Sequence, residues 1–196
     1  YLLKSISCPV FGTPFTLGMV RHRLEEHDLL AQARLHEIHP GERLRLGPFE
    51  MAFIRVGHSV VDGIGLAIET PEGRIVHTGD FKISHPRMLG MGTDIDGFAR
   101  CGQQGVLALL SDSTNVEKEG FTISDREIGE RLFKIVSASG GRVIVALFAS
   151  NILRIQQIVD AARACGRKLC INGKSIEISV GLAKELGHIR IPPEME

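Results

Sequence analysis

The chain has 196 residues, enough to bury about 70% of its unfolded surface in one large core or two small ones. Its hydrophobic fraction of 43% and charged fraction of 23% are typical of a globular α/β protein and exclude a disordered or fibrous one. Basic and acidic residues both number 23, so the overall charge does not indicate a nucleic-acid binder, and any polyanion site must be local.

Two further exclusions come from the apolar and cysteine patterns. No run of 18 apolar residues occurs, so we expect no membrane span. The four cysteines are scattered, with no C-x-x-C pair and no signal peptide ahead of them, which favours free thiols in a reducing cytoplasm over disulfides. The first residue is Tyr1 rather than methionine, and residues 1–4 resemble the last turn of a helix, so we expect a fragment of a longer protein.

The first half of the sequence predicts short strands and one helix. The strands are expected at residues 8–11, 34–38, 43–46, 53–56, 65–68 and 74–76, and the helix at residues 16–26. Thr13 is the expected N-cap of that helix, and Pro14 its first residue. Residues 34–38 and 43–46 alternate polar with apolar side chains around a turn, which predicts a hairpin with one wet face.

Polar side chains follow two of the three strands between residues 53 and 76. The first of these strands ends at Gly57-His58, and the third runs into His77-Thr78-Gly79-Asp80. A histidine and a carboxylate at neighbouring strand ends suit a zinc-type ion, with His58 and Asp80 as ligands. A hydrogen-bonded core or surface role is the alternative for each. His77 is either a structural hydrogen-bonding residue or a partner that orients Asp80.

The second half alternates strands with helices. Residues 84–105 predict a long loop with one short helix. An uninterrupted apolar run at 106–110 predicts a parallel strand covered on both faces. Further strands are expected at 142–148 and 169–171, and helices at 124–137, 151–164 and 175–186, the second capped by Ser150. This order predicts a parallel sheet with right-handed crossovers.

Short polar residues follow two of the predicted parallel strands. Asp112-Ser113-Thr114-Asn115 follows the strand at 106–110, and Ser150-Asn151 follows the strand at 142–148. Ligands of open α/β sheets bind beyond the carboxyl ends of strands, so Ser113, Asn115, Ser150 and Asn151 suit contact with a phosphate. Simple capping and turn chemistry is the alternative reading of the same residues.

Four motifs occur in order along the chain. They are Gly57-His58-Ser59-Val60-Val61-Asp62, Val76-His77-Thr78-Gly79-Asp80-Phe81-Lys82, Leu110-Ser111-Asp112-Ser113-Thr114-Asn115 and Phe148-Ala149-Ser150-Asn151-Ile152-Leu153-Arg154-Ile155-Gln156-Gln157. They resemble the ribonuclease J family, metallo-β-lactamase-fold ribonucleases with an inserted β-CASP domain. The fold implied is α/β, with the second half of a metallo-β-lactamase αββα sandwich at residues 1–122 and the first half of a parallel-sheet β-CASP domain at residues 123–196.

The resemblance also implies roles for individual residues. His58 would bind one zinc ion, Asp80 would bridge two, and their spacing, 80 − 58 = 22, agrees with the family pattern. Asp112 would support catalysis by hydrogen bonding to a metal-ligating histidine. The implied activity is hydrolysis of RNA phosphodiesters, from the 5′ end and internally, by a cytoplasmic homo-oligomer with RNA as its partner.

One departure from the family limits these expectations. The main metal motif of the family, His-x-His-x-Asp-His, is absent from this sequence. His58 and Asp80 supply at most two ligands, so we expect that the polypeptide alone neither holds two zinc ions nor cleaves RNA. The alternative function is a non-catalytic phosphate-binding or assembly module of the same fold.

Overall fold

A computed structural model describes residues 2–83, 92–120 and 122–195, and the chain divides into two compact units. The first unit comprises Tyr1–His58, Asp62–Ile83 and Met91–Thr114. The second comprises Ser59–Val61, Ser84–Gly90 and Asn115–Glu196. The domain boundary expected between residues 122 and 123 stays a prediction.

The first unit begins with a small β-α-β arrangement. Strand β1 (Pro9–Gly12) pairs in parallel with β2 (Arg34–Glu37), and helix α1 (Pro14–Glu25) connects them, with short 3-10 turns at Leu2–Lys4 and Leu30–Gln32. The apolar side of α1 supplies the core, since Phe15 and Leu17 are each 1% exposed. The strand and helix expected here are confirmed, with Thr13 as the N-cap residue of α1.

The hairpin expected between residues 34–38 and 43–46 is wrong. Strand β2 pairs with β1, whereas β3 (Arg43–Leu46) pairs with β4 (Phe49–Arg55). The ladder of β1 and β2 extends to Ile38, whose N–H donates to the Gly12 carbonyl at 3.0 Å and whose side chain is buried. Strand β2 therefore pairs with β1 and buries Ile38, instead of forming the local hairpin that the alternation of polar and apolar residues suggested.

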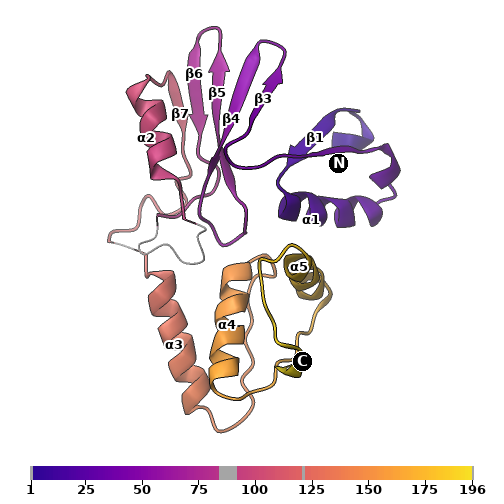
Figure 1. Ribbon diagram of the computed structural model, residues 1–196, viewed down its shortest axis with the longest axis vertical. Coiled ribbons are helices and arrows are strands. Elements are labelled where there is room, and N and C mark those ends of the chain that lie inside the picture. Colours follow the sequence, from indigo (N-terminus) through magenta and orange to yellow (C-terminus); the bar gives the residue numbers. More distant parts are fainter. Residues whose placement is uncertain (1, 84–91, 121, 196) are drawn as a thin grey trace. The chain divides into compact units, whose positions relative to one another are not determined.

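The main sheet of the first unit has five strands in the order β3-β4-β5-β6-β7 (Figure 1). Strands β5 (Ile64–Thr70) and β6 (Gly73–His77) continue the antiparallel meander, whereas β7 (Ala108–Leu110) runs parallel to β6. The three strands expected between residues 53 and 76 are confirmed by β4, β5 and β6. Because β4, β6 and β7 run in the same direction, their carboxyl ends meet at one edge of the sheet.

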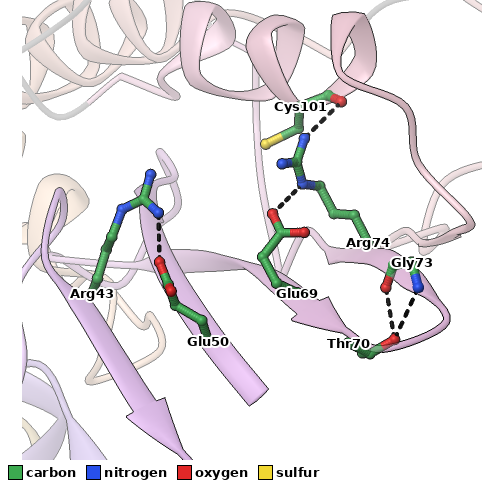
Figure 2. A network of polar contacts seen from close by, with 7 residues as sticks. All are labelled: Arg43, Glu50, Glu69, Thr70, Gly73, Arg74 and Cys101. Atoms are coloured by element: carbon green, nitrogen blue, oxygen red, sulfur yellow. Dashed lines mark hydrogen bonds and ion pairs between the residues drawn. The ribbon is translucent and has the colours of Figure 1, made fainter. Parts of the chain in front are cut away.

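Helix α2 (Ile95–Gln103) covers one face of this sheet. A Cβ added at Gly97 would lie 3.0 Å from Cγ2 of Ile54, and one added at Gly65 would lie 2.9 Å from Cζ of Phe98. Figure 2 shows a polar connection between the same two elements, in which the Arg74 guanidinium donates to the Cys101 carbonyl at 3.2 Å. The short helix expected within residues 84–105 is confirmed; residues 84–91 lie outside the described part of the chain.

The double-sided burial expected for residues 106–110 is wrong. Strand β7 is parallel, as expected, but in the described sheet it lies at the edge, next to β6 alone. Leu107 is 62% exposed and Leu109 is 63% exposed. An apolar run identifies a strand that could be covered, but it does not supply the elements that would cover it.

The second unit contains helices α3 (Asp125–Ala138), α4 (Ile152–Ala164) and α5 (Lys174–Glu185), followed by a 3-10 turn at Pro193–Met195. All three helices were expected. The Ser124 hydroxyl accepts a hydrogen bond from the Glu127 N–H at 3.2 Å, as a helix N-cap does. The core gathers on α4 and α5, where Ile152 and Ala183 are 0% exposed.

The strands expected at residues 142–148 and 169–171 are not formed. None of residues 122–195, the described part of the second unit beyond residue 121, lies in a strand. Ile144 is 87% exposed and Phe148 is 84% exposed. A strand requires neighbours that accept and donate its backbone hydrogen bonds, and here Leu169 N–H donates to the Met195 carbonyl instead, at 2.7 Å. The mixed α/β class is confirmed, but the described residues contain no parallel sheet in this half.

None of the helices in the described ranges has the length and apolar character needed to cross a membrane.

Candidate functional site

The predicted site residues of the first unit lie just after strands that end at the same sheet edge. His58 follows β4, His77 ends β6 and Asp80 comes three residues later, and Asp112 follows β7. In the sheet, β6 and β7 are neighbours and β5 lies between β4 and β6, so the topology brings three chain segments to the same edge. The candidate site is built at this edge.

The turn that carries Asp80 requires glycine at position 79. Gly79 has φ +62°, and a Cβ at this position would lie 2.8 Å from the carbonyl oxygen of Ile64. An L side chain is disfavoured by both the backbone angle and the contact. The close approach holds the turn against the start of β5 and so fixes the main-chain position of Asp80, the next residue.

His77 makes a hydrogen bond to the same turn. Its Nδ1 accepts a hydrogen bond from the Gly79 N–H at 3.0 Å, so in the neutral imidazole the proton resides on Nε2. This bond is the structural hydrogen-bonding role considered for His77. The other role, orienting Asp80 as a metal ligand, stays a prediction.

Asp112 is joined to the Asp80 turn through Thr78. The Asp112 N–H donates to Thr78 Oγ1 at 3.0 Å, and the Thr78 N–H donates to the Leu110 carbonyl at 3.0 Å. The Thr78 hydroxyl in turn donates to the Gly79 carbonyl at 2.8 Å. Thr78 is 7% exposed. The segment after β7 is therefore fixed against the segment after β6.

The carboxyl group of Asp112 is held in its ionised form. Its Oδ1 accepts hydrogen bonds from the Thr114 hydroxyl at 2.6 Å and the Thr114 N–H at 3.0 Å. The pKa of Asp112 is lowered, chiefly by the Thr114 hydroxyl and then by the Thr114 N–H, with smaller contributions from the Phe81 N–H and His58. Asp112 thus interacts with residues of both the His58 and the Asp80 segments. Its hydrogen bond to a metal-ligating histidine stays a prediction.

Two residues of this region were not singled out from the sequence. Asp62 Oδ2 accepts a hydrogen bond from the Phe15 N–H at 2.9 Å, and Oδ1 accepts one from the Thr13 hydroxyl at 2.8 Å. Thr93 Oγ1 accepts a hydrogen bond from the Gly57 N–H at 2.9 Å. Asp62-Gly63 suggested only a connection between strands, and Thr93 lies in a segment where the sequence pattern is irregular. Neither residue carries a sequence signal for its long-range partner.

The residues proposed to contact phosphate or RNA do not form a single described site. Ser113 belongs to the first unit, and Asn115, Ser150 and Asn151 belong to the second. The predicted helix cap at Ser150 is wrong, because Asn151 Oδ1 accepts a hydrogen bond from the Arg154 N–H at 3.0 Å and caps α4. The side-chain oxygen of Asn151 is therefore already used as the N-cap of α4. Contact of these four residues with phosphate stays a prediction.

The donor set of His58 and Asp80 is incomplete for zinc. His58 and Asp80 offer an imidazole and a carboxylate, which are suitable zinc ligands, but a catalytic zinc site uses at least three protein ligands. Among residues 2–83, 92–120 and 122–195, no three His, Cys, Asp or Glu side chains are grouped so that they could hold a metal ion. The described residues alone do not make a zinc site.

Part of the chain matches a known family model, and nearly all of it is similar to known proteins. Residues 140–196 match the family model described as Ribonuclease J, beta-CASP domain. The chain is 40% identical over 192 residues to Ribonuclease J 1 of Streptococcus pyogenes, which covers 98% of this chain and 34% of the relative. It is 40% identical over 195 residues to Ribonuclease J2 of Bacillus subtilis, with 100% of this chain and 35% of the relative covered.

A third relative, Ribonuclease J of Thermus thermophilus, is 40% identical over 190 residues, covering 96% of this chain and 33% of the relative. The resemblance to the ribonuclease J family is therefore confirmed, and it extends over nearly the whole chain. The chain spans about a third of the length of these curated relatives.

A solved structure shows that the fold recurs at low sequence identity. The crystal structure of a protein of unknown function from Enterococcus faecalis V583 aligns with a TM-score of 0.68 at 15% identity. It covers 97% of this chain and 48% of the other chain. This similarity concerns the fold alone.

Proposed function

We propose that the chain is a part of a zinc-dependent ribonuclease that hydrolyses RNA phosphodiesters, as a 5′ exonuclease, an endonuclease or both. The observation that carries the proposal is the convergence of the His58, Asp80 and Asp112 segments at the carboxyl ends of β4, β6 and β7. The names of the relatives, each called a ribonuclease, support the same activity.

Within this proposal the residues have separate tasks. In the intact enzyme His58 and Asp80 would each supply one ligand to a metal centre. Ions held there would supply a nucleophile at neutral pH and stabilise charge on the attacked phosphate. Asp112, kept ionised by Thr114, would accept a hydrogen bond from a metal-ligating histidine and so orient it. His77 supports the Asp80 turn through its bond to Gly79.

RNA is the proposed substrate and partner, and a cytoplasmic homo-oligomer the proposed state of the intact enzyme. Ser113, Asn115, Ser150 and Asn151 are the proposed contacts to the RNA phosphates. Polar side chains and main-chain N–H groups near the helix start at Asn151 suit a phosphate oxygen. The 196-residue chain by itself is proposed to be inactive, because His58 and Asp80 are too few ligands.

The test is a chimaera in which this chain replaces the matching third of the Thermus thermophilus ribonuclease J. We expect the chimaera to cleave a 5′-monophosphorylated RNA in the presence of Zn²⁺, and the isolated chain to leave it intact. His58→Ala and Asp80→Ala in the chimaera should each reduce cleavage by about 10²-fold or more. His27→Ala, at an exposed histidine after α1, is the matched control and should retain activity.

Two results would contradict the proposal. Full cleavage by a well-folded His58→Ala chimaera would show that His58 is not a ligand of the metal centre. A folded chimaera that binds RNA but does not cleave it, under conditions where the parent enzyme is active, would favour the phosphate-binding module instead.

A further inference from the structure

Thr93 lies where the segment carrying His58 meets the segment carrying Asp80. Its Oγ1 accepts a hydrogen bond from the Gly57 N–H at 2.9 Å and donates one to the Lys82 carbonyl at 2.9 Å. Gly57 is the residue before His58, and Lys82 comes two residues after Asp80. A single hydroxyl group therefore bridges the main chains of the two segments.

The two segments also bond to each other directly. The Lys82 N–H donates to the Gly57 carbonyl at 2.7 Å. Together with the two bonds of Thr93, this makes a closed arrangement in which Gly57 and Lys82 each use both main-chain polar groups. Gly57 is buried and Thr93 is only 5% exposed, so water cannot readily replace these bonds.

Thr93 is itself held in place by its neighbour Asp94. The Asp94 N–H donates to the Arg55 carbonyl at 2.9 Å, at the end of β4. The Asp94 side chain accepts a hydrogen bond from the Gly97 N–H at 3.0 Å and caps α2. The start of α2 and the end of β4 thus place the Thr93 hydroxyl at the junction.

We propose that Thr93 is a positioning residue that sets the separation of His58 and Asp80. This inference rests on the proposed function insofar as His58 and Asp80 bind metal. Metal ligands must be held within roughly half an ångström of their required geometry, and main-chain bonds beside each ligand provide that restraint. Thr93 acts through the main chain beside His58 and Asp80 rather than through their side chains.

The test uses the whole 196-residue chain and three variants. Thr93→Val removes the hydroxyl group with little change in shape, Thr93→Ala removes it without the risk of overpacking, and Thr93→Ser keeps it. Thr70→Val is the matched control. The Thr70 hydroxyl also bonds main-chain groups, but at the β5–β6 turn: those of Gly73, which Figure 2 shows, and the Glu72 N–H.

Amide hydrogen exchange, measured by NMR, reports how well the main-chain hydrogen bonds of Gly57 and Lys82 are protected. In Thr93→Val and Thr93→Ala we expect the Gly57 and Lys82 amides to exchange about tenfold faster or more, while amides within β5 keep their rates. Thr93→Ser should match the wild type, and Thr70→Val should leave Gly57 and Lys82 unchanged. Wild-type exchange at Gly57 and Lys82 in a folded Thr93→Val or Thr93→Ala protein would overturn the proposal.

Zn²⁺ titration of the chimaera described above, carrying the same substitutions, separates this inference from the proposed function. We expect the apparent Zn²⁺ affinity of the chimaera to fall about threefold or more with Thr93→Val and to be restored with Thr93→Ser. His58→Ala should abolish that binding. If His58→Ala binds Zn²⁺ as the wild type does, the ligand assignment fails, while the exchange rates still decide whether Thr93 joins the two segments. Unchanged affinity in Thr93→Val, with binding lost in His58→Ala, would overturn the positioning role alone.

Discussion

The carboxylate of Asp62 caps a helix that lies far from it in the sequence: its Oδ2 accepts a hydrogen bond from the Phe15 N–H, in the first turn of α1, at 2.9 Å. The Asp62 backbone adopts φ +54°, a left-handed conformation that costs energy for a residue other than glycine. A carboxylate at a helix N-terminus gains from the free N–H groups and from the helix dipole. The fold therefore accepts local strain at Asp62 and anchors α1 to the segment that follows His58.

We expect Asp62→Gly to destabilise the first unit even though glycine relieves the backbone. The loss of the bonds to Phe15 and Thr13 should cost about 1–2 kcal/mol, more than the relief at φ +54° returns. Urea unfolding followed by circular dichroism measures the change. The matched control is Asp28→Gly, at the exposed Asp28 with φ 55°, which should be neutral or slightly stabilising. Equal effects at the two positions would contradict the capping role.

A second prediction compares two arginine–glutamate pairs on the same sheet face (Figure 2). Arg74 Nε donates to Glu69 at 2.5 Å, its guanidinium also bonds the Cys101 carbonyl, and its side chain is 16% exposed. Arg43 bonds Glu50 at 2.6 Å but is 69% exposed. Arg74→Met should lower the free energy of unfolding by about 1.5–3 kcal/mol, because a shielded charged bond and a link to α2 are both lost.

Arg43→Met should change the same quantity by about 0–1 kcal/mol, because solvent screens an exposed pair. Both variants are measured by urea unfolding at low and high salt. If the two substitutions cost the same, burial and the bond to Cys101 do not strengthen the Arg74 pair.

The sequence predicted local features better than long-range ones. Periodicity and caps located α1, α3, α4 and α5, because a helix satisfies its backbone groups within one segment. The strands at 142–148 and 169–171 failed because strand formation depends on partners that no local pattern specifies. The hairpin at 34–46 failed for the same reason, since β2 and β3 each pair with another strand.

The same contrast holds for the candidate site. His58, Asp80 and Asp112 could be selected because their residue types and the strand ends before them are visible in the sequence. Asp62 and Thr93 could not, because their roles depend on partners 47 and 36 residues away. Residues that position a site are thus harder to predict than residues that perform its chemistry.

A third prediction concerns apolar side chains exposed in the second unit. Ile144 is 87% exposed, Val145 38% and Phe148 84%, so one short segment presents several apolar groups to solvent. Such clusters promote association. We expect the chain to self-associate with rising concentration in sedimentation velocity experiments, and Phe148→Asp to weaken this association about tenfold or more.

Val116→Asp is the control for that substitution. Val116 belongs to the same unit and is 77% exposed, but it lies in a turn away in sequence from the cluster at 144–148. Single exposed apolar residues are common on protein surfaces, so Val116→Asp should leave the association unchanged. A wild-type chain that stays monomeric at all concentrations would contradict the prediction.

The last prediction follows from the ionised state of Asp112. Its pKa lies below the ordinary value of 3.8, first because of the Thr114 hydroxyl and then because of the Thr114 N–H. A carboxyl group whose pKa is lower in the folded than in the unfolded state stabilises the fold at pH values above its unfolded pKa. That contribution is lost as the pH falls through the folded pKa.

Thr114→Val removes the 2.6 Å hydroxyl bond, so the pKa of Asp112 should rise towards its ordinary value and the acid dependence of stability should weaken. Thr114→Ser keeps the hydroxyl group and should retain the low pKa. An NMR titration of the Asp112 carboxyl carbon measures both variants, and an unchanged pKa in Thr114→Val would show that the hydroxyl group does not hold Asp112 in its charged form.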